Sequence, residues 1–270
     1  MARRDPEQDQ ALTRGETVVS SIYGSGRGYD LLYPGSAALP AFWLDLARTH
    51  GDPVLEFMSG TGSIAIPLAQ AGHDVTGVEM AEPMLAEARR KSDAAGVDVT
   101  WVQGDARGFD LGRQFRLILL PSNSICHLLT RLDLEACLAT VARHLEPEGR
   151  FALNVFVPSM PLLLRSPEED QEFGGYIDPD SGEQVVMTHR SRYDADSQIK
   201  HHQLFRRVGD GPIEPDGELT MRIYFPQELD ALLWYNGFAI EHKYGDDRRP
   251  FDAQSGMQYF VLKLRDQPDT

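Results

Sequence analysis

The sequence predicts an α/β fold in which a doubly wound, mostly parallel sheet carries an inserted antiparallel β cap. Between residues 53 and 157, short apolar runs alternate with helical segments, which is typical of a parallel sheet covered by helices. Residues 158–225 lose this alternation and show strand-like stretches separated by turn residues. A helix and two strands then follow, so we expect a core of residues 21–157 and 226–270 around the insertion.

Five buried strands and three helices are expected in the first part of the core. Strands buried on both faces are short continuous apolar runs, whereas apolar residues three and four apart indicate helices. Pro83 near the start of one helix and Gly96 after its end are typical boundaries. The expected strands are 53–57, 74–79, 97–103, 115–120 and 151–157; the expected helices are 62–71, 82–95 and 132–145, with a turn at 147–149.

The flanking regions are less regular. Residues 1–20 are polar and are expected to form a flexible tail, and residues 21–35 are too rich in glycine for a good helix interior. Turn residues 194–197 separate two strand-like stretches that indicate a hairpin. The remaining expected elements are a helix at 36–49, hairpin strands at 183–193 and 198–208, a strand at 218–225, a helix at 227–236, and strands at 238–244 and 258–264.

The composition excludes several classes of protein. A formal net charge of −15 repels phosphate backbones, so we expect no nucleic-acid partner and favour a small-molecule acceptor. No run approaches the ~18 apolar residues that cross a bilayer, and the charged N-terminus lacks an apolar signal segment. We therefore expect a cytoplasmic protein with no membrane partner. Cys126 and Cys137 form no disulfide framework, and no Cys/His spacing indicates a metal site.

The strongest motif is a Gly-rich turn, Glu-Phe-Met-Ser-Gly-Thr-Gly at residues 56–62, between the first strand and the first helix. Glycines allow backbone N–H groups to approach a ligand, and the helix N-terminus supplies partial positive charge. Gly60, Gly62 and Ala65 also satisfy the dinucleotide fingerprint, although that match alone is weak. The turn predicts a Rossmann-like site for a nucleotide-like ligand.

Three acidic residues distinguish between ligands for this turn. Glu56 lies on the first strand, where a carboxylate disfavours a pyrophosphate and favours a cationic group. Glu79 ends the second strand, where it can accept hydrogen bonds from ribose, and Asp105 follows the third, where it can accept one from an adenine amino group. S-adenosylmethionine fits this set better than NAD. The structural alternatives are an exposed strand-end carboxylate at Glu79 and a helix cap at Asp105.

In this order the motifs resemble the class I S-adenosylmethionine-dependent methyltransferase family, small-molecule type. The resemblance covers residues 50–157 and, more loosely, 226–265. Met58 replaces the first glycine of the family's turn, so we expect a negative φ at this position. The resemblance implies S-adenosylmethionine as cofactor. It implies cofactor-binding roles for Glu56, Gly60, Thr61, Gly62, Glu79, Met80, Met84, Gly104, Asp105, Ala106 and Pro121.

The acceptor is expected beside the loop that follows the fourth strand, at residues 121–127. His127 is the best candidate base there, and it is similar to a histidine of the sugar-amine N,N-dimethyltransferases; a helix-start histidine without chemistry is the alternative. Tyr33 matches the family's Tyr-Asp-x-x-Tyr pattern in a segment that folds over the cofactor. That resemblance implies contact with the transferring group, whereas aromatic packing of a lid, shared with Tyr23 and Tyr29, is the alternative.

The inserted sheet is expected to cap the acceptor site, and a homodimer through it is a further expectation. Neighbours on a strand point to opposite faces, so His201 and His202 cannot chelate one ion, and solvent exposure is expected for both. Arg27 is expected to be a solvated loop residue. The other basic or aromatic residues noted in this sheet are Arg190, Arg192, Tyr193, Arg206 and Arg207.

These observations predict a methyltransferase that uses S-adenosylmethionine to methylate an N or O atom of a small-molecule acceptor. In-line displacement on a sulfonium works largely through proximity and orientation, so a base is needed only if the acceptor must lose a proton. Three alternatives stay open: an NAD-dependent oxidoreductase, a non-catalytic S-adenosylmethionine-binding protein, and another reaction of the bound sulfonium.

Overall fold

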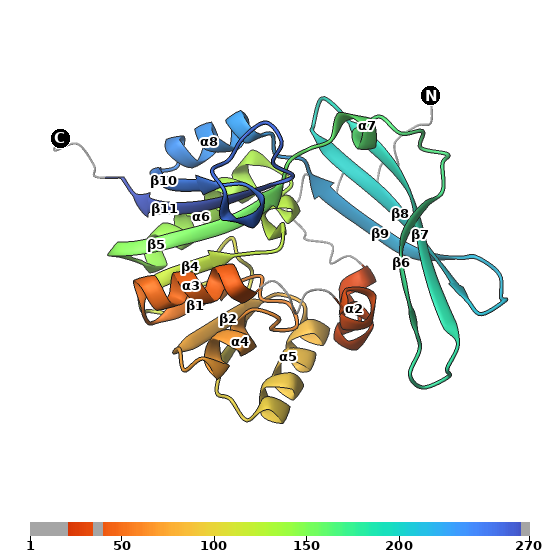
Figure 1. The fold of residues 1–270 in the computed structure, drawn as a ribbon, viewed down its shortest axis with the longest axis horizontal. Helices are drawn as coiled ribbons and strands as arrows, with labels where there is room; N and C mark the ends of the chain where they lie inside the picture. Colours follow the sequence, from red (N-terminus) through yellow and green to blue (C-terminus); the bar gives the residue numbers. More distant parts are fainter. Residues whose placement is uncertain (1–20, 35–39, 266–270) are drawn as a thin grey trace.

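The computed structural model describes residues 21–34 and 40–265, and within them the chain forms two β-sheets (Figure 1). The larger sheet has seven strands in the order β10-β11-β5-β4-β1-β2-β3, and the smaller has four in the order β6-β7-β8-β9. The expected α/β fold with an inserted antiparallel sheet is confirmed. The expected flexible tail at 1–20 lies outside the described residues.

Strands β1 to β5 of the seven-stranded sheet run parallel to one another. In their bounds, β1 is Val54–Phe57, β2 Val75–Glu79, β3 Thr100–Gln103, β4 Phe115–Leu120, β5 Leu145–Phe156, β10 Phe238–Tyr244 and β11 Met257–Leu264. Strand β11 pairs antiparallel with β5, and β10 with β11. The strand order reverses between β1 and β4, and ligands of open α/β sheets bind at such a reversal, beyond the carboxyl ends of the strands.

Helices cover both faces of this sheet because successive side chains of its strands point to opposite sides. Leu55 belongs to a core cluster with side chains of α6 and α8, whereas the neighbouring Val54 belongs to a cluster with side chains of α3 and α4. The helix bounds are α3 Pro40–His50, α4 Ala65–Gln70, α5 Glu82–Ala95, α6 Arg131–His144 and α8 Pro226–Tyr235.

The turn expected at 147–149 lies inside β5 as a bulge. Leu145 pairs with Phe115 of β4 and the next partners are Arg150 and Leu117, so four residues on one strand oppose one on the other. The four residues between Leu145 and Arg150 do not pair with β4, and β5 continues beyond them.

The four-stranded sheet confirms the expected hairpin, formed by β7 (Gln184–Asp194) and β8 (Ile199–Val208). Strand β9 (Glu214–Arg222) begins and ends earlier than expected. The turn-rich appearance of residues 158–182 concealed α7 (Met160–Leu163) and the edge strand β6 (Gln171–Ile177). Two glycines and a bulge interrupt the alternation of β6, which removes its sequence signal.

The expectation that residues 21–35 avoid helix is wrong. A 3₁₀ turn, η1 (Ser21–Tyr23), precedes α2 (Gly26–Leu32), and the Ser25 hydroxyl accepts a hydrogen bond from the Gly28 N–H as an N-cap. A Cβ on Gly26 would lie 2.5 Å from the Glu87 Cβ, so this glycine allows α2 to pack directly against α5. Tertiary packing outweighs the poor helix propensity of glycine here. Helix α2 lies between the two sheets (Figure 1).

Trp101 on β3 packs tightly against the neighbouring strand. It pairs with Gly77 of β2, and a Cβ on Gly77 would lie 2.4 Å from the indole ring. A Cβ on Gly62 would lie 2.7 Å from the same ring, and the indole N–H donates to Ser92 of α5. This side chain therefore joins the Gly-rich turn, the sheet and α5.

Replacing Gly77 with alanine is expected to displace Trp101 and lower the free energy of unfolding by about 1–3 kcal/mol, as overpacking does. At this chain length that corresponds to a fall in Tm of roughly 2–10 °C, measured by calorimetry. Gly108→Ala is the matched control, since no atom lies within 4 Å of its Cβ position. Equal Tm values for the two variants would contradict the tight packing.

Candidate active site

The Gly-rich turn follows β1 at the strand reversal and has an unusual backbone. Gly60 and Gly62 have φ values of 56° and 80°, which glycine adopts without strain. Met58 has a φ of 51°, so the expected negative φ at this position is wrong. The backbone at residue 58 is therefore left-handed even though methionine stands there, and the Met58 side chain packs against the core cluster. Such a conformation costs a non-glycine residue about 1–2 kcal/mol.

Glu56 occupies the centre of the site as a buried carboxyl group. It is 1% exposed, and its Oε2 has no hydrogen-bond partner among the described residues. Burial raises its pKa to about 8, against the opposing effect of a hydrogen bond from the Ala65 backbone. An unpaired buried carboxyl is costly unless a ligand supplies a donor or a cation. The position therefore fits the α-ammonium group of an amino-acid moiety.

Glu79 at the end of β2 holds the turn closed. Its Oε2 accepts a hydrogen bond from the Gly60 N–H at 2.9 Å, and its Oε1 accepts from the N–H groups of Met80 and Ala81, each at 2.9 Å. A carboxylate has about four lone-pair sites, so one or more remain for ribose hydroxyls. Glu79 thus has a structural role besides its expected ligand role.

The expected adenine-binding residues lie where the third strand ends, but Asp105 is already paired. Burial would raise its pKa, yet hydrogen bonds from Arg107 outweigh that effect and hold the pKa below its usual value. Arg107 also donates to Asp133 of α6. The Gly104 N–H donates to the Glu79 carbonyl, and the Ala106 side chain is buried in the core. A role for Asp105 at adenine stays a prediction, in which Arg107 shares the carboxylate.

The other expected cofactor residues surround the turn. Met84 is 2% exposed, and its Cε lies 3.6 Å from the Cβ position of Gly60, so its side chain packs against the turn. Met80 is partly exposed beside Glu79, whereas Pro121 is buried at the end of β4. Thr61 is buried, and its hydroxyl donates to Asp30 of α2 at 2.6 Å.

That hydrogen bond is part of a network that fixes α2 over the turn. The Lys91 ammonium of α5 donates to Asp30 at 2.6 Å and to the Thr61 hydroxyl at 3.1 Å. Sequence reasoning missed Asp30 and Lys91, because nothing local indicates that they meet. On the other side of α2, Arg27 forms an exposed ion pair with Asp180, between β6 and β7. Arg27 was expected to be a solvated loop residue; its side chain is 56% exposed, but it lies in α2.

The loop after β4 is strained and held in place by two asparagines. Ser122 and Asn123 have φ values of 60° and 61°. The Ser122 N–H donates to the side chain of Asn154, which is 1% exposed, and the Asn123 side chain accepts from the Phe156 N–H. Asn154 was not predicted; a buried amide in the middle of an apolar strand was the available signal. The loop leads into the 3₁₀ helix η3 (Ser124–His127).

His127 meets Tyr23, not Tyr33, in this structure. The Tyr23 hydroxyl and His127 Nε2 are 2.8 Å apart, and burial lowers the pKa of His127 to about 4, so its imidazole is neutral at neutral pH. Burial also raises the pKa of Tyr23 well above its usual value, so its phenol is protonated, and the tautomer of the imidazole decides which of the two groups donates. The Tyr33 ring contacts that of Tyr29 at a tilt of 46°, and Tyr29 in turn contacts Tyr23. Tyr33 also contacts the ring of Phe173 in β6.

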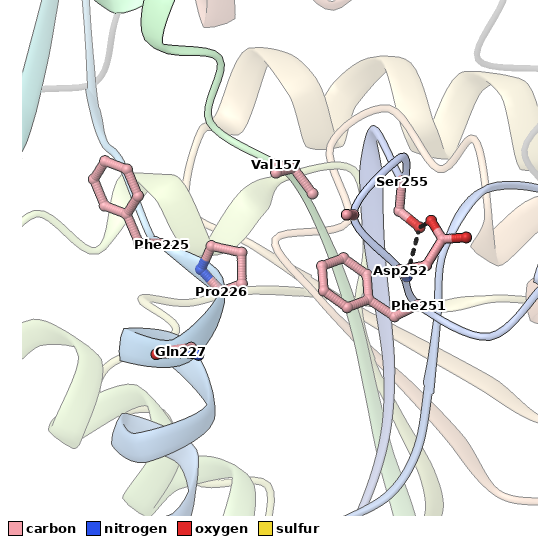
Figure 2. A pocket seen from close by; sticks show the side chains of 8 residues that line it. Val157, Phe225, Pro226, Gln227, Phe251, Asp252 and Ser255 are labelled. Carbon is pink, nitrogen blue, oxygen red and sulfur yellow. Dashed lines mark hydrogen bonds between the residues drawn. The ribbon is translucent and has the colours of Figure 1, made fainter.

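A cleft of about 480 Å³ opens where the chain leaves the core for the four-stranded sheet and returns (Figure 2). Figure 2 shows Phe225 and Phe251 on opposite sides of it, with Val157 between them and Asp252 at one end. The adjacent Tyr224 hydroxyl donates to the Leu128 carbonyl after η3. The chain next to the cleft is therefore bonded to the residue that follows η3, although the residues that line the cleft do not include His127.

The two adjacent histidines of β8 point to opposite faces, as expected. His201 interacts with Asp194, whereas His202 is 9% exposed and contacts the His189 ring, so the expected exposure of His202 is wrong. The described residues contain no group of three or more His, Cys, Asp or Glu side chains placed to hold a metal ion. Cys126 and Cys137 are buried free thiols.

Comparisons with known proteins agree with this geometry. Residues 54–149 match a family model described as a methyltransferase domain. A putative methyltransferase of Bacillus subtilis, YqeM, is 32% identical over 223 residues, which cover 81% of this chain and 86% of that protein. The solved structure of the CcbJ methyltransferase from Streptomyces caelestis has a TM-score of 0.69 and 27% identity, covering 86% of this chain and 90% of that one.

A further relative acts on an amino sugar. The dTDP-3-amino-3,4,6-trideoxy-α-D-glucopyranose N,N-dimethyltransferase of Streptomyces venezuelae is 35% identical over 128 residues, which cover 45% of this chain and 52% of that protein. The chain thus matches about half the length of this relative. Separately, no helix in the described part of the chain is long and apolar enough to cross a membrane.

Glu56→Gln is expected to remove a pH-dependent loss of stability. Below the ordinary pKa of 4.5 the carboxyl is protonated in both folded and unfolded chains; between 4.5 and about 8 only the unfolded chain ionises, which favours unfolding. The variant's advantage in free energy of unfolding should therefore grow by up to about 1.4 kcal/mol per pH unit across this window. Urea unfolding at several pH values measures it, and a constant difference would contradict the raised pKa.

Asp30→Asn is expected to loosen α2 from the turn, because it removes the charge that pairs with Lys91. Affinity for S-adenosylhomocysteine, measured by calorimetry, should fall roughly 5- to 20-fold, in keeping with about 1–2 kcal/mol for one partly buried charge-assisted hydrogen bond. Arg27→Gln is the control on the same helix, since exposed ion pairs contribute little. An Asp30 variant that binds as tightly as the control would show that the network does not support the site.

Proposed function

Because this chain belongs to the family of S-adenosylmethionine-dependent methyltransferases, we propose that it methylates the amine nitrogen of a small-molecule acceptor. Its methyl donor is S-adenosylmethionine, and the alternative of an NAD-dependent oxidoreductase is wrong. The sequence left both N and O acceptors open, and this proposal chooses the nitrogen of an amine. The observation that carries it is the neutral, partly buried His127, hydrogen-bonded to Tyr23.

A neutral imidazole with so low a pKa is a weak base. It cannot efficiently remove a proton from an alcohol, whose oxygen must lose that proton to become a good nucleophile. A neutral amine already carries a nucleophilic lone pair, so it needs only orientation and a hydrogen-bond acceptor for its N–H. The burial that lowers the pKa of His127 also favours the neutral form of an amine placed beside it. The amino-sugar relative supports the same choice.

Each part of the site has a distinct role in this proposal. When bound, the sulfonium of S-adenosylmethionine supplies an electrophilic methyl carbon. Glu56 would bind the α-ammonium group, and Glu79 would bind the ribose while keeping the Gly60 turn closed. Helix α2, held against the Gly-rich turn by the contact of Asp30 with Thr61, would exclude water from the cofactor site. With Nε2–H donating to the Tyr23 oxygen, which orients the ring, the other ring nitrogen of His127 would accept a hydrogen bond from the amine.

The test is methyl transfer to a panel of amines, including free and nucleotide-linked amino sugars, matched with the corresponding alcohols, with S-adenosylhomocysteine formation as the readout. His127→Asn should lower kcat by about 10²-fold, within the usual range for such groups. Tyr23→Phe keeps the ring and loses the 2.8 Å hydrogen bond, so it should lower kcat by about tenfold.

Neither variant should change the affinity for S-adenosylhomocysteine by more than about twofold, because neither side chain is assigned to the cofactor. Activity confined to the alcohols, or full activity of His127→Asn, would contradict the proposal. Binding of S-adenosylhomocysteine without turnover of any acceptor would instead favour the non-catalytic alternative.

A further inference from the structure

The two faces of the four-stranded sheet differ in how most of their basic residues are paired. Ser191 of β7 pairs with His202 of β8, so His189, Ser191, Lys200 and His202 share one face by the alternation of strand residues. Phe173 contacts both His189 and Tyr33 of the α2 region, which identifies this as the face toward α2. On the other face three basic residues are paired with acids, whereas Arg207 donates to the Gly209 carbonyl. These pairs are Arg190 with Asp170, and Arg192 and His201 with Asp194.

Two basic residues at one end of the face toward α2 have no acidic partner among the described residues, whereas Arg206, farther along β8 on the same face, pairs with Asp216. Within the described ranges, Lys200 and Arg165 form no ion pair: the Lys200 ammonium donates to the Leu162 carbonyl of α7 at 3.3 Å, and Arg165 donates to the Gln171 side chain at 3.2 Å. Lys200 itself is partly buried, and burial together with Arg165 lowers its pKa. The chain has 41 acidic and 26 basic residues, so a basic cluster without carboxylates contrasts with its overall charge.

Two imidazoles in the cluster have unsatisfied nitrogens. The rings of His189 and His202 lie 4.9 Å apart, and the Nδ1 atom of each is buried with no hydrogen-bond partner among the described residues. Burial, followed by the nearby Lys200, lowers the pKa of His202 to about 3, so its neutral ring can present an N–H donor. A buried polar atom left without a partner costs about 1–3 kcal/mol, which a ligand can recover.

The cluster is connected to the catalytic histidine by a row of aromatic rings. His189 contacts Phe173, which contacts Tyr33; Tyr29 and Tyr23 then lead to His127, with every neighbouring pair of ring centroids between 4.8 and 6.1 Å apart. These rings come from β7, β6, η1, η3 and α2 with its C-cap residue Tyr33. The row of ring contacts therefore runs from the basic cluster to His127 on the side of the four-stranded sheet that faces α2.

We propose that Arg165, His189, Lys200 and His202 form a subsite for an anionic group, a carboxylate or a phosphate, at the end of the acceptor remote from its amine. This inference rests on the proposed function, because it assigns the far end of the same acceptor. Lys200 and Arg165 supply the positive charge, and the two imidazole Nδ1 atoms supply directed hydrogen bonds. Charge-assisted bonds of this kind are the strong ones in anion recognition.

The first test is calorimetric titration of the full chain, saturated with S-adenosylhomocysteine, using inorganic phosphate, pyrophosphate and acetate in separate runs. We expect 1:1 binding of phosphate and pyrophosphate, or of acetate, and the preferred anion identifies the source. Lys200→Gln should weaken that binding at least tenfold, whereas Arg190→Gln, on the opposite face of the same sheet, should leave it unchanged. Equal losses in both variants, or no binding of any of the three anions, would overturn the proposal.

A second test uses the wild-type protein, so it does not depend on whether a variant folds. In wild-type protein labelled with ¹⁵N at histidine, the preferred anion should shift the ring resonances of His189 and His202 and spare His201, which faces Asp194. Shifts at His201 alone would place the anion elsewhere. Since S-adenosylhomocysteine binding is measured first, its absence would count against the proposed function, whereas its presence without anion binding would count against this subsite alone.

Discussion

Glu56 places a carboxyl group inside the sheet with one oxygen unpartnered, and the rest of the site is arranged around that constraint. The buried neighbours of β1 hold it there, and burial keeps it protonated near neutral pH. A cationic or hydrogen-bond-donating ligand arriving at the carboxyl end of β1 turns this unfavourable position into a favourable one. The Gly-rich turn, closed by Glu79, leaves the room for such a ligand.

Helix α2 joins the two halves of the molecule on which such a reaction depends. Asp30 ties it to the cofactor turn through Thr61 and Lys91, and Arg27 ties it to the four-stranded sheet. Tyr23, which precedes it, reaches His127. This one short helix therefore contacts both the cofactor side and the acceptor side of the site.

Much of the core could be predicted from the sequence because its signals are local. Apolar runs and helix boundaries fixed most elements within a few residues, and the acidic residues after successive strands indicated the cofactor. The misses depend on contacts between distant segments. Helix α2 forms because Gly26 fits against Glu87, Met58 keeps a strained φ inside a turn set by its neighbours, and the basic cluster exists only through the pairing of β7 with β8. Composition and periodicity do not record such pairings.

Proton release on ligand binding tests the central role of Glu56 most directly. Calorimetry with S-adenosylhomocysteine at pH 6, in buffers of different ionisation enthalpy, counts the protons exchanged; at this pH the ligand's α-amino group is already charged. Because Glu56 has a pKa of about 8 in the ligand-free protein, a bound cation should cause it to ionise and release close to one proton per site. Glu56→Gln should release none. No release from the wild type, or the same release from the variant, would contradict this account of the site.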